Sequence, residues 1–231
     1  MNVLAIDTAT AFLCIGLSDG VKQYLTRLEV GTGLSSMLVK TIRGHLDALG
    51  WEAADIDCFA CGSGPGSFTA LRIGMAAIKA MAWATHKPVA GIPSLDILAY
   101  ALRGEDAVLV PVMDAKRAMV YTAAYAVSAG VLRRITPYQL IPAGDFAAVM
   151  GRKICSRRQK RIIITGDAAD LVRPALSGSL LRAETAEKDL RNPSPHALLE
   201  LAQQACARKQ TCDAFRLKPL YLYPQECQIR K

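Results

Sequence analysis

The sequence predicts an α/β fold of two lobes, each built from a mixed β-sheet flanked by helices. A chain of 231 residues is long for one compact core and comfortable for two lobes of about 100 residues each. A composition of 52% hydrophobic and 21% charged residues supplies ample material for globular cores. Strand, turn, helix and strand patterns follow one another along the chain, as in α/β proteins. We expect the lobes to comprise residues 1–105 and 106–231.

The first lobe begins with strand patterns. Residues 3–20 (VLAIDTATAFLCIGLSDG) predict two strands joined by a short polar turn at Asp7, Thr8 and Thr10. Residues 21–29 are suited to a third strand. Residues 55–61 (DIDCFAC) indicate a buried strand, and residues 88–92 (PVAGI) indicate a short one. Together they predict a mixed sheet.

Two longer helices belong to this lobe. In the first, Leu38, Ile42, Leu46 and Leu49 recur at helical spacing, and Gly50 is suited to end the helix. The second follows a glycine-rich turn and ends before residue 88. A third, shorter helix is expected at residues 94–103 (SLDILAYALR).

The second lobe starts with residues 107–127, which predict two strands. A strand at residues 131–135, a helix at 144–150, a strand at 161–165 and a helix at 195–209 follow. The sequence contains no internal repeat and no low-complexity tract that would alter this order.

The cysteines and histidines do not indicate a metal site. Seven cysteines form an odd and scattered set, which argues against a disulfide framework and for a reducing compartment. Cys58 and Cys61 form a C-x-x-C pair, but no second pair or nearby histidine completes a zinc site. We interpret them as small apolar core residues. No metal and no other cofactor is expected.

The N-terminus shows no secretory signal, because it lacks a basic region and a cleavage site. No stretch approaches the roughly 18 apolar residues of a membrane span. We therefore expect a cytoplasmic chain that does not insert into a membrane.

The glycine-rich turn within residues 62–74 (GSGPGSFTALRIG) is the sharpest local motif. A glycine-rich turn opening a helix points backbone N–H groups outward, as phosphate sites do. The turn matches neither the P-loop nor the dinucleotide pattern. The residues suited to a vestigial phosphate turn are Asp7, Thr8, Gly64, Gly66 and Ser67. The alternatives are a tight turn capped by Ser67 or Thr69, and an Asp7 that only bonds nearby backbone.

The helix after this turn lacks a polar side. Between residues 69 and 85 the only charges are Arg72 and Lys79, whereas Ala70, Gly74 and Ala77 form a stripe of small residues. A surface helix of a monomer normally carries a broad polar face. This helix is therefore either buried inside its own lobe or covered by another subunit.

Charge is divided unequally along the chain. Residues 1–110 hold 8 Lys and Arg against 10 Asp and Glu, whereas residues 111–231 hold 20 against 10. This asymmetry indicates that the C-terminal lobe meets a polyanion. The densest basic segment is residues 152–161, whose candidate RNA contacts are Arg152, Lys153, Arg157, Arg158, Lys160 and Arg161. Such contacts would be directed at the RNA backbone, and the alternative is a solvated loop.

Several motifs in this order resemble one known family. VLAIDTAT, GPGSFTALRIG, PVAGIPSLDILA, PVMDAKRAMVY and KPLYLYP are similar to the corresponding segments of the bacterial TsaB (YeaZ) family, from residue 2 to about residue 224. The resemblance implies an actin-like fold of the acetate and sugar kinase/heat-shock/actin superfamily. It also implies a pseudo-enzyme without catalytic residues of its own.

The resemblance further implies partners. The family pairs with its larger paralogue TsaD as a heterodimer and works with the ATPase TsaE. The assembly installs a threonylcarbamoyl group on the tRNA adenosine at position 37, so tRNA contact would be indirect or weak. The family's pairing surface lies on helices equivalent to residues 34–49 and 68–84. Candidate partner-binding residues are Leu34, Leu38, Ile42, Ala70, Ile73, Gly74, Ala77 and Met81. An isolated chain could form a homodimer through the same face.

Two further functions stay open at this point. The chain could be an active ATP-dependent kinase or phosphotransferase of the same superfamily, with Asp7 holding magnesium and residues 62–69 contacting phosphate. It could also bind RNA directly through its basic half, which is compatible with the partner-subunit function.

Overall fold

The computed structural model describes residues 1–154, 161–177 and 183–223, and these form two compact units. Unit 1 contains residues 1–97 and 193–220, and unit 2 contains residues 98–192 together with the described residues from 221 onward. The expected division into residues 1–105 and 106–231 differs from this arrangement. The chain returns to unit 1 after residue 192, because its last helix packs on the sheet of unit 1.

The sheet of unit 1 is mixed, as predicted. Its strands are β1 (Val3–Asp7), β2 (Phe12–Ser18), β3 (Gln23–Glu29), β4 (Cys58–Gly64) and β5 (Val89–Pro93), in the spatial order β3-β2-β1-β4-β5. The first three strands are antiparallel neighbours joined by short turns, whereas β4 runs parallel to both β1 and β5. Parallel neighbours need crossover connections, and helices supply them.

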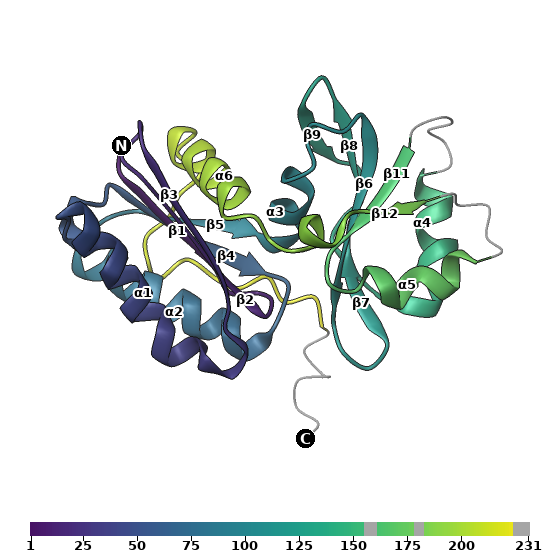
Figure 1. Ribbon diagram of the computed structural model, residues 1–231, viewed down its shortest axis with the longest axis horizontal. Coiled ribbons are helices and arrows are strands. Elements are labelled where there is room, and N and C mark those ends of the chain that lie inside the picture. Colours follow the sequence, from purple (N-terminus) through teal and green to yellow (C-terminus); the bar gives the residue numbers. More distant parts are fainter. Residues whose placement is uncertain (155–160, 178–182, 224–231) are drawn as a thin grey trace. The chain divides into compact units, whose positions relative to one another are not determined.

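Helices cover both faces of this sheet. Figure 1 shows α1 (Leu34–Leu49) and α2 (Phe68–Ala84) on one face and α6 (Pro195–Ala207) on the other. Gly50 ends α1 in the left-handed conformation, with φ of 67°, as its sequence predicts. Ser194 caps α6 by accepting a hydrogen bond from the Ala197 N–H, and Pro195 occupies the first helical position.

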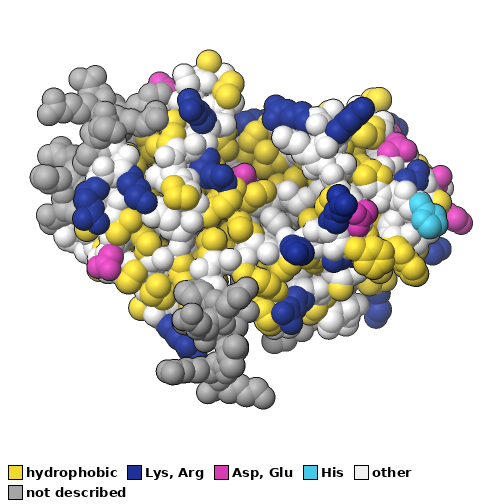
Figure 2. Space-filling model, turned by 180° about the vertical axis from the view of Figure 1, so that it is seen from behind, with side chains coloured by type: hydrophobic (Ala, Val, Ile, Leu, Met, Phe, Trp, Pro, Cys, Tyr) yellow, Lys and Arg dark blue, Asp and Glu magenta, His cyan; other side chains and the backbone are white. Residues whose placement is uncertain are grey.

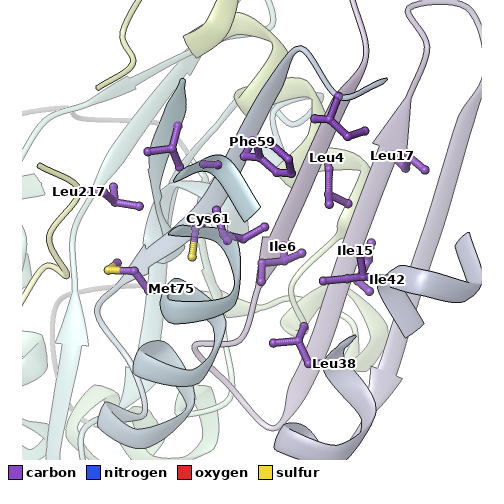
Figure 3. Packing of buried hydrophobic residues seen from close by; sticks show 14 of the residues in the cluster. Leu4, Ile6, Ile15, Leu17, Leu38, Ile42, Phe59, Cys61, Met75 and Leu217 are labelled. Atoms are coloured by element: carbon purple, nitrogen blue, oxygen red, sulfur yellow. The ribbon is translucent and has the colours of Figure 1, made fainter. Parts of the chain in front are cut away.

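The core of unit 1 lies between the sheet and the helices α1 and α2. Figure 3 shows Leu38 and Ile42 of α1 lying close to Ile6 and Ile15 of the sheet. These side chains are at most 3% exposed. The helical spacing that predicts α1 therefore corresponds to the face that the helix turns toward its own sheet.

Unit 2 is a second α/β layer structure. It contains α3 (Ser94–Tyr100, which begins in unit 1), β6 (Ala107–Asp114), β7 (Met119–Thr122), β8 (Tyr125–Ser128), β9 (Val131–Arg134), β10 (Gln139–Pro142), α4 (Phe146–Ile154), β11 (Arg161–Thr165), α5 (Ala169–Leu176) and β12 (Glu184–Thr185). The main strand order is β10-β7-β6-β11-β12, and β8 pairs with β6 and β9. Phe146, Met150 and Val172 bring α4 and α5 into one core with this sheet.

The structure corrects the interpretation of the cysteines. Cys58 forms a disulfide with Cys206 of α6, 148 positions away, whereas Cys61 is a buried free thiol. Residues three apart on a strand point to opposite faces of the sheet. Cys58 and Cys61 therefore cannot pair with each other. Cys58 meets α6 only because the chain returns to unit 1, which local spacing does not reveal.

Within residues 1–154, 161–177 and 183–223, no helix combines the length and the apolar character needed to cross a membrane.

Candidate functional site

In the glycine-rich turn between β4 and α2, the space beside Gly66 is occupied by Ala9 of the same chain. A Cβ atom at Gly66 would overlap the Ala9 carbonyl oxygen in the turn after β1. The same carbonyl accepts a hydrogen bond from the Ser67 N–H at 2.9 Å. A backbone donor that a phosphate would need is therefore already used.

A second close approach lies about two helical turns further along the chain, at Gly74 of α2. A Cβ atom at Gly74 would overlap the Thr8 side chain, which is 1% exposed. The Thr8 hydroxyl donates a hydrogen bond to the Ala70 carbonyl at 2.8 Å. The structure thus brings the predicted turn residues Thr8, Gly66 and Ser67 together, but it uses them to lock α2 onto the end of β1. This arrangement does not fit a phosphate cradle at the turn.

Asp7 lies at the end of β1 and is 1% exposed. Its Oδ1 accepts a hydrogen bond from the Ser94 hydroxyl at 3.0 Å, whereas its Oδ2 has no hydrogen-bond partner among the described residues. Burial raises the pKa of Asp7 to about 6, against smaller lowering effects of Ser94 and of the backbone at Ala9 and Thr8. The carboxyl group therefore changes protonation close to neutral pH.

Two buried thiols lie within the electrostatic reach of this carboxyl group. Burial, followed by the negative charge of Asp7, raises the pKa of the Cys14 and Cys61 thiols above their ordinary value. A thiol kept protonated is a poor nucleophile and a poor metal ligand. Among the residues that the structure describes, no group of three or more His, Cys, Asp or Glu side chains is arranged to hold a metal ion.

The candidate partner-binding residues divide into two sets. Leu34, Leu38 and Ile42 are 6%, 1% and 3% exposed and belong to the core of unit 1, and Gly74 is buried against Thr8. The expectation that these four residues face a partner is therefore wrong for their side chains, which the chain already covers. The remaining four are only half-buried against the same core: Ala70, Ile73, Ala77 and Met81.

The solvent-exposed side of α2 carries few charged residues. Its exposed residues include Phe68, Arg72, Ala76 and Ala80, which we call the α2 outer face. The Arg72 guanidinium lies 3.8 Å from the centroid of the Phe68 ring, a cation–π contact. Lys79 donates a hydrogen bond to the Leu217 carbonyl at 3.1 Å. Both cations of the helix are thus engaged within the chain, and small or apolar side chains form much of the remainder.

The predicted RNA contacts are only partly described. Arg152 and Lys153 are exposed at the end of α4, whereas Arg157, Arg158 and Lys160 lie outside the described residues. Arg161 is exposed but contacts the carboxylates of Glu184 and Glu105 at 2.6 Å and 3.0 Å. Since these two carboxylates offset its charge, Arg161 is not the free phosphate contact that its sequence context predicts.

A groove at the C-terminal end of α2 was not predicted from the sequence. Trp83 and Phe215 are 61% and 73% exposed and line the same hollow, whose volume is about 570 Å³. Trp83 is a sequence signal for it, because a tryptophan on a helix with only two charged residues is expected to be either buried or accessible to a ligand. Phe215 belongs to no periodic pattern and reaches the groove only through the return of the chain to unit 1.

Comparisons with known proteins agree with this architecture. The model of the family described as TsaD: tRNA N6-adenosine threonylcarbamoyltransferase matches residues 32–226. The tRNA threonylcarbamoyladenosine biosynthesis protein TsaB of Bacillus subtilis (strain 168) is 26% identical over 100% of this chain and 97% of its own length. Its namesake in Haemophilus influenzae is 27% identical over 96% of this chain and 93% of its own length.

A solved structure shows the same fold. YeaZ from Pseudomonas aeruginosa aligns with a TM-score of 0.80 at 24% identity, and the alignment covers 96% of this chain and 99% of that one. The predicted fold class, an actin-like α/β fold with mixed sheets flanked by helices, is confirmed. The chain therefore belongs to the family described as TsaD: tRNA N6-adenosine threonylcarbamoyltransferase, and within it to the TsaB (YeaZ) proteins.

Proposed function

We propose that this chain is a non-catalytic subunit of the assembly that makes threonylcarbamoyladenosine in tRNA. Its main partner would be the larger paralogue TsaD, bound as a heterodimer, and TsaE and tRNA would join the same assembly. The names of the Bacillus subtilis and Haemophilus influenzae relatives support the pathway. The partner role is supported by the exposed surface of α2.

The observation that carries the proposal is the contrast between the start of α2 and its outer face. At the start, Thr8 and Ala9 fill the glycine-rich turn, which argues against phosphate chemistry there. On the outer face, Ala76 and Ala80 are exposed and both cations of α2 are engaged within the chain. A helix of small residues lets a second helix pack closely, and we propose that a TsaD helix does so.

Size-exclusion chromatography of the chain mixed with TsaD from the same organism tests this role. We expect the wild-type chain to co-elute with TsaD and Ala76→Arg to elute separately. An arginine buried without a partner at an interface costs about 3–5 kcal/mol, which is roughly a 100-fold loss of affinity or more. Ala148→Arg is the matched control, because Ala148 is an exposed helical alanine on α4 of unit 2.

Two results would contradict different parts of the proposal. Co-elution of Ala76→Arg at wild-type yield would contradict the proposed surface, whereas failure of the wild-type chain to bind TsaD would contradict the proposed partner. The isolated wild-type chain is expected to form homodimers through the α2 outer face. The Ala76→Arg variant should then elute as a monomer.

One observation favours the alternative of an active ATP-dependent kinase. Asp7 is buried with an unpartnered Oδ2, and a carboxylate at this place could meet a magnesium-bound phosphate. Isothermal titration with Mg-ATP discriminates the two functions. Micromolar binding by the isolated chain would favour the kinase, and absence of binding would favour the partner subunit.

A further inference from the structure

The groove at the end of α2 presents two aromatic side chains from distant parts of the sequence. Trp83 and Phe215 both line the hollow of about 570 Å³ and a smaller adjoining one of about 250 Å³. Ala82 and Ala214, the residues beside them, are 1% and 6% exposed. Each aromatic ring therefore projects from a segment that is anchored in the core.

The segment that carries Phe215 is held to the sheet by backbone hydrogen bonds. Val89 and Cys212 exchange two N–H to carbonyl bonds, each of 2.9 Å. The Asp213 carboxylate accepts bonds from the N–H groups of Phe215 and Arg216 at 2.8 Å and 3.1 Å. The rings are thus displayed on fixed backbone, which lowers the entropy lost when a ligand binds.

Positively charged side chains lie beside these rings. Lys79 and Lys87 line the two hollows, and Arg216 follows Phe215 directly in the sequence. The neighbouring carboxylates are Asp57, which lies 3.9 Å from Lys87, and Asp213, which lies 3.2 Å from Arg216. Three cations against two carboxylates leave a small local excess of positive charge. Figure 2 shows Lys and Arg side chains interspersed with hydrophobic ones over the described part of one face.

This composition distinguishes between two classes of ligand. Protein interfaces are enriched in aromatic residues and arginine but depleted of lysine. Single-stranded nucleic acids bind where aromatic rings stack on bases and nearby Lys and Arg contact the backbone. With Lys79 and Lys87 lining the hollows beside two exposed rings, the groove fits the second class better.

We propose that the Trp83–Phe215 groove binds single-stranded RNA by stacking bases on the two rings. The surrounding lysines and arginines would contact phosphates, so binding would tolerate many sequences and weaken as salt rises. The inference rests on the proposed function only for the presence of RNA in the assembly. It places the RNA contact on unit 1 and not on the basic segment 152–161.

Fluorescence anisotropy with the isolated full chain tests this groove. The probe is a fluorescein-labelled oligouridylate of about 12 nucleotides, within the site sizes of single-strand binders. Trp83→Ala and Phe215→Ala should each weaken binding about tenfold, since stacking contributes that order of affinity for each base. Trp83→Phe should keep most of the affinity. Val131→Ala is the control, because Val131 is a 66% exposed apolar residue in unit 2.

Tryptophan fluorescence gives a second readout. The chain has 2 tryptophans, Trp51 and Trp83, so Trp51→Phe leaves Trp83 as the only indole. RNA should quench this emission, and raising salt from about 50 to about 200 mM should reverse the quenching.

Three outcomes would overturn the proposal. They are absence of binding by the wild-type chain, equal affinity of the wild type and both alanine variants, and loss of TsaD co-elution in those variants without any change in RNA affinity. The last would assign the groove to a protein partner. Because RNA binding is measured without TsaD, and pairing is measured with Ala76→Arg, failure of one proposal is distinguishable from failure of the other.

Discussion

Gly74 and Ala76 lie two residues apart on α2, yet they are small for different reasons. A side chain at Gly74 would overlap Thr8, so the fold itself requires a glycine there. Ala76 is exposed to solvent, so burial within the chain does not explain its small size. A small residue therefore indicates a docking surface only after packing within the chain has been excluded as its cause.

The glycine-rich turn and the α2 outer face differ in the same way, because the chain's own residues pack against the first and leave the second exposed. The turn is glycine-rich and opens a helix, as phosphate sites do, but Ala9 packs against Gly66 and accepts the Ser67 N–H, and Thr8 packs against Gly74. The outer face has no recognised motif, but it leaves small and apolar side chains uncovered. We therefore propose a function for the exposed α2 outer face, and not for the glycine-rich turn, although the turn is the more distinctive motif.

The largest expected effect on stability concerns Asp7, whose Oδ2 atom has no hydrogen-bond partner among the described residues. Its pKa is raised from 3.8 to about 6, so the folded state disfavours the ionised form. The unfolded chain releases this proton at lower pH, and stability should therefore fall as pH rises through this range. The loss is roughly 3 kcal/mol by linkage and is complete above the folded pKa.

Urea unfolding of the wild type and Asp7→Asn at several pH values checks this dependence. The asparagine variant should lose the decline in stability between pH 3.8 and about 6. An identical pH profile in both proteins would show that Asp7 is not the group responsible.

A smaller effect is expected from glycine replacements on the two helices. Gly74→Ala inserts a methyl group against Thr8 and should lower the free energy of unfolding by about 1–3 kcal/mol. Gly44→Ala on α1 meets nothing within 4 Å and should raise it by about 0.5–1 kcal/mol, because alanine favours helix. Equal effects of the two substitutions on the free energy of unfolding in urea would contradict the difference in packing between Gly74 and Gly44.

Much of the fold was predictable because its signals are local. The spacing of Leu38, Ile42 and Leu46 predicts α1, and Gly50 predicts its end. The same spacing could not say what the apolar stripe faces, and assigning Leu38 and Ile42 to a partner was wrong. An amphipathic pattern shows that a face is covered, and only the tertiary structure shows by what.

The features that sequence missed depend on contacts between distant segments. The return of α6 to unit 1 places Cys206 against Cys58 and Phe215 beside Trp83. Nothing in the spacing of these residues indicates such neighbours. The pairing of Arg161 with Glu105 and Glu184 likewise joins three segments, and it offsets a charge that appears free in the sequence.

Hydrogen exchange of the chain alone and mixed with TsaD shows whether the α2 outer face is a docking surface. We predict that amides of α2 become more protected in the mixture while those of α6, on the opposite face of the sheet (Figure 1), do not change. Unchanged exchange in α2, with protection appearing only elsewhere, would contradict the account.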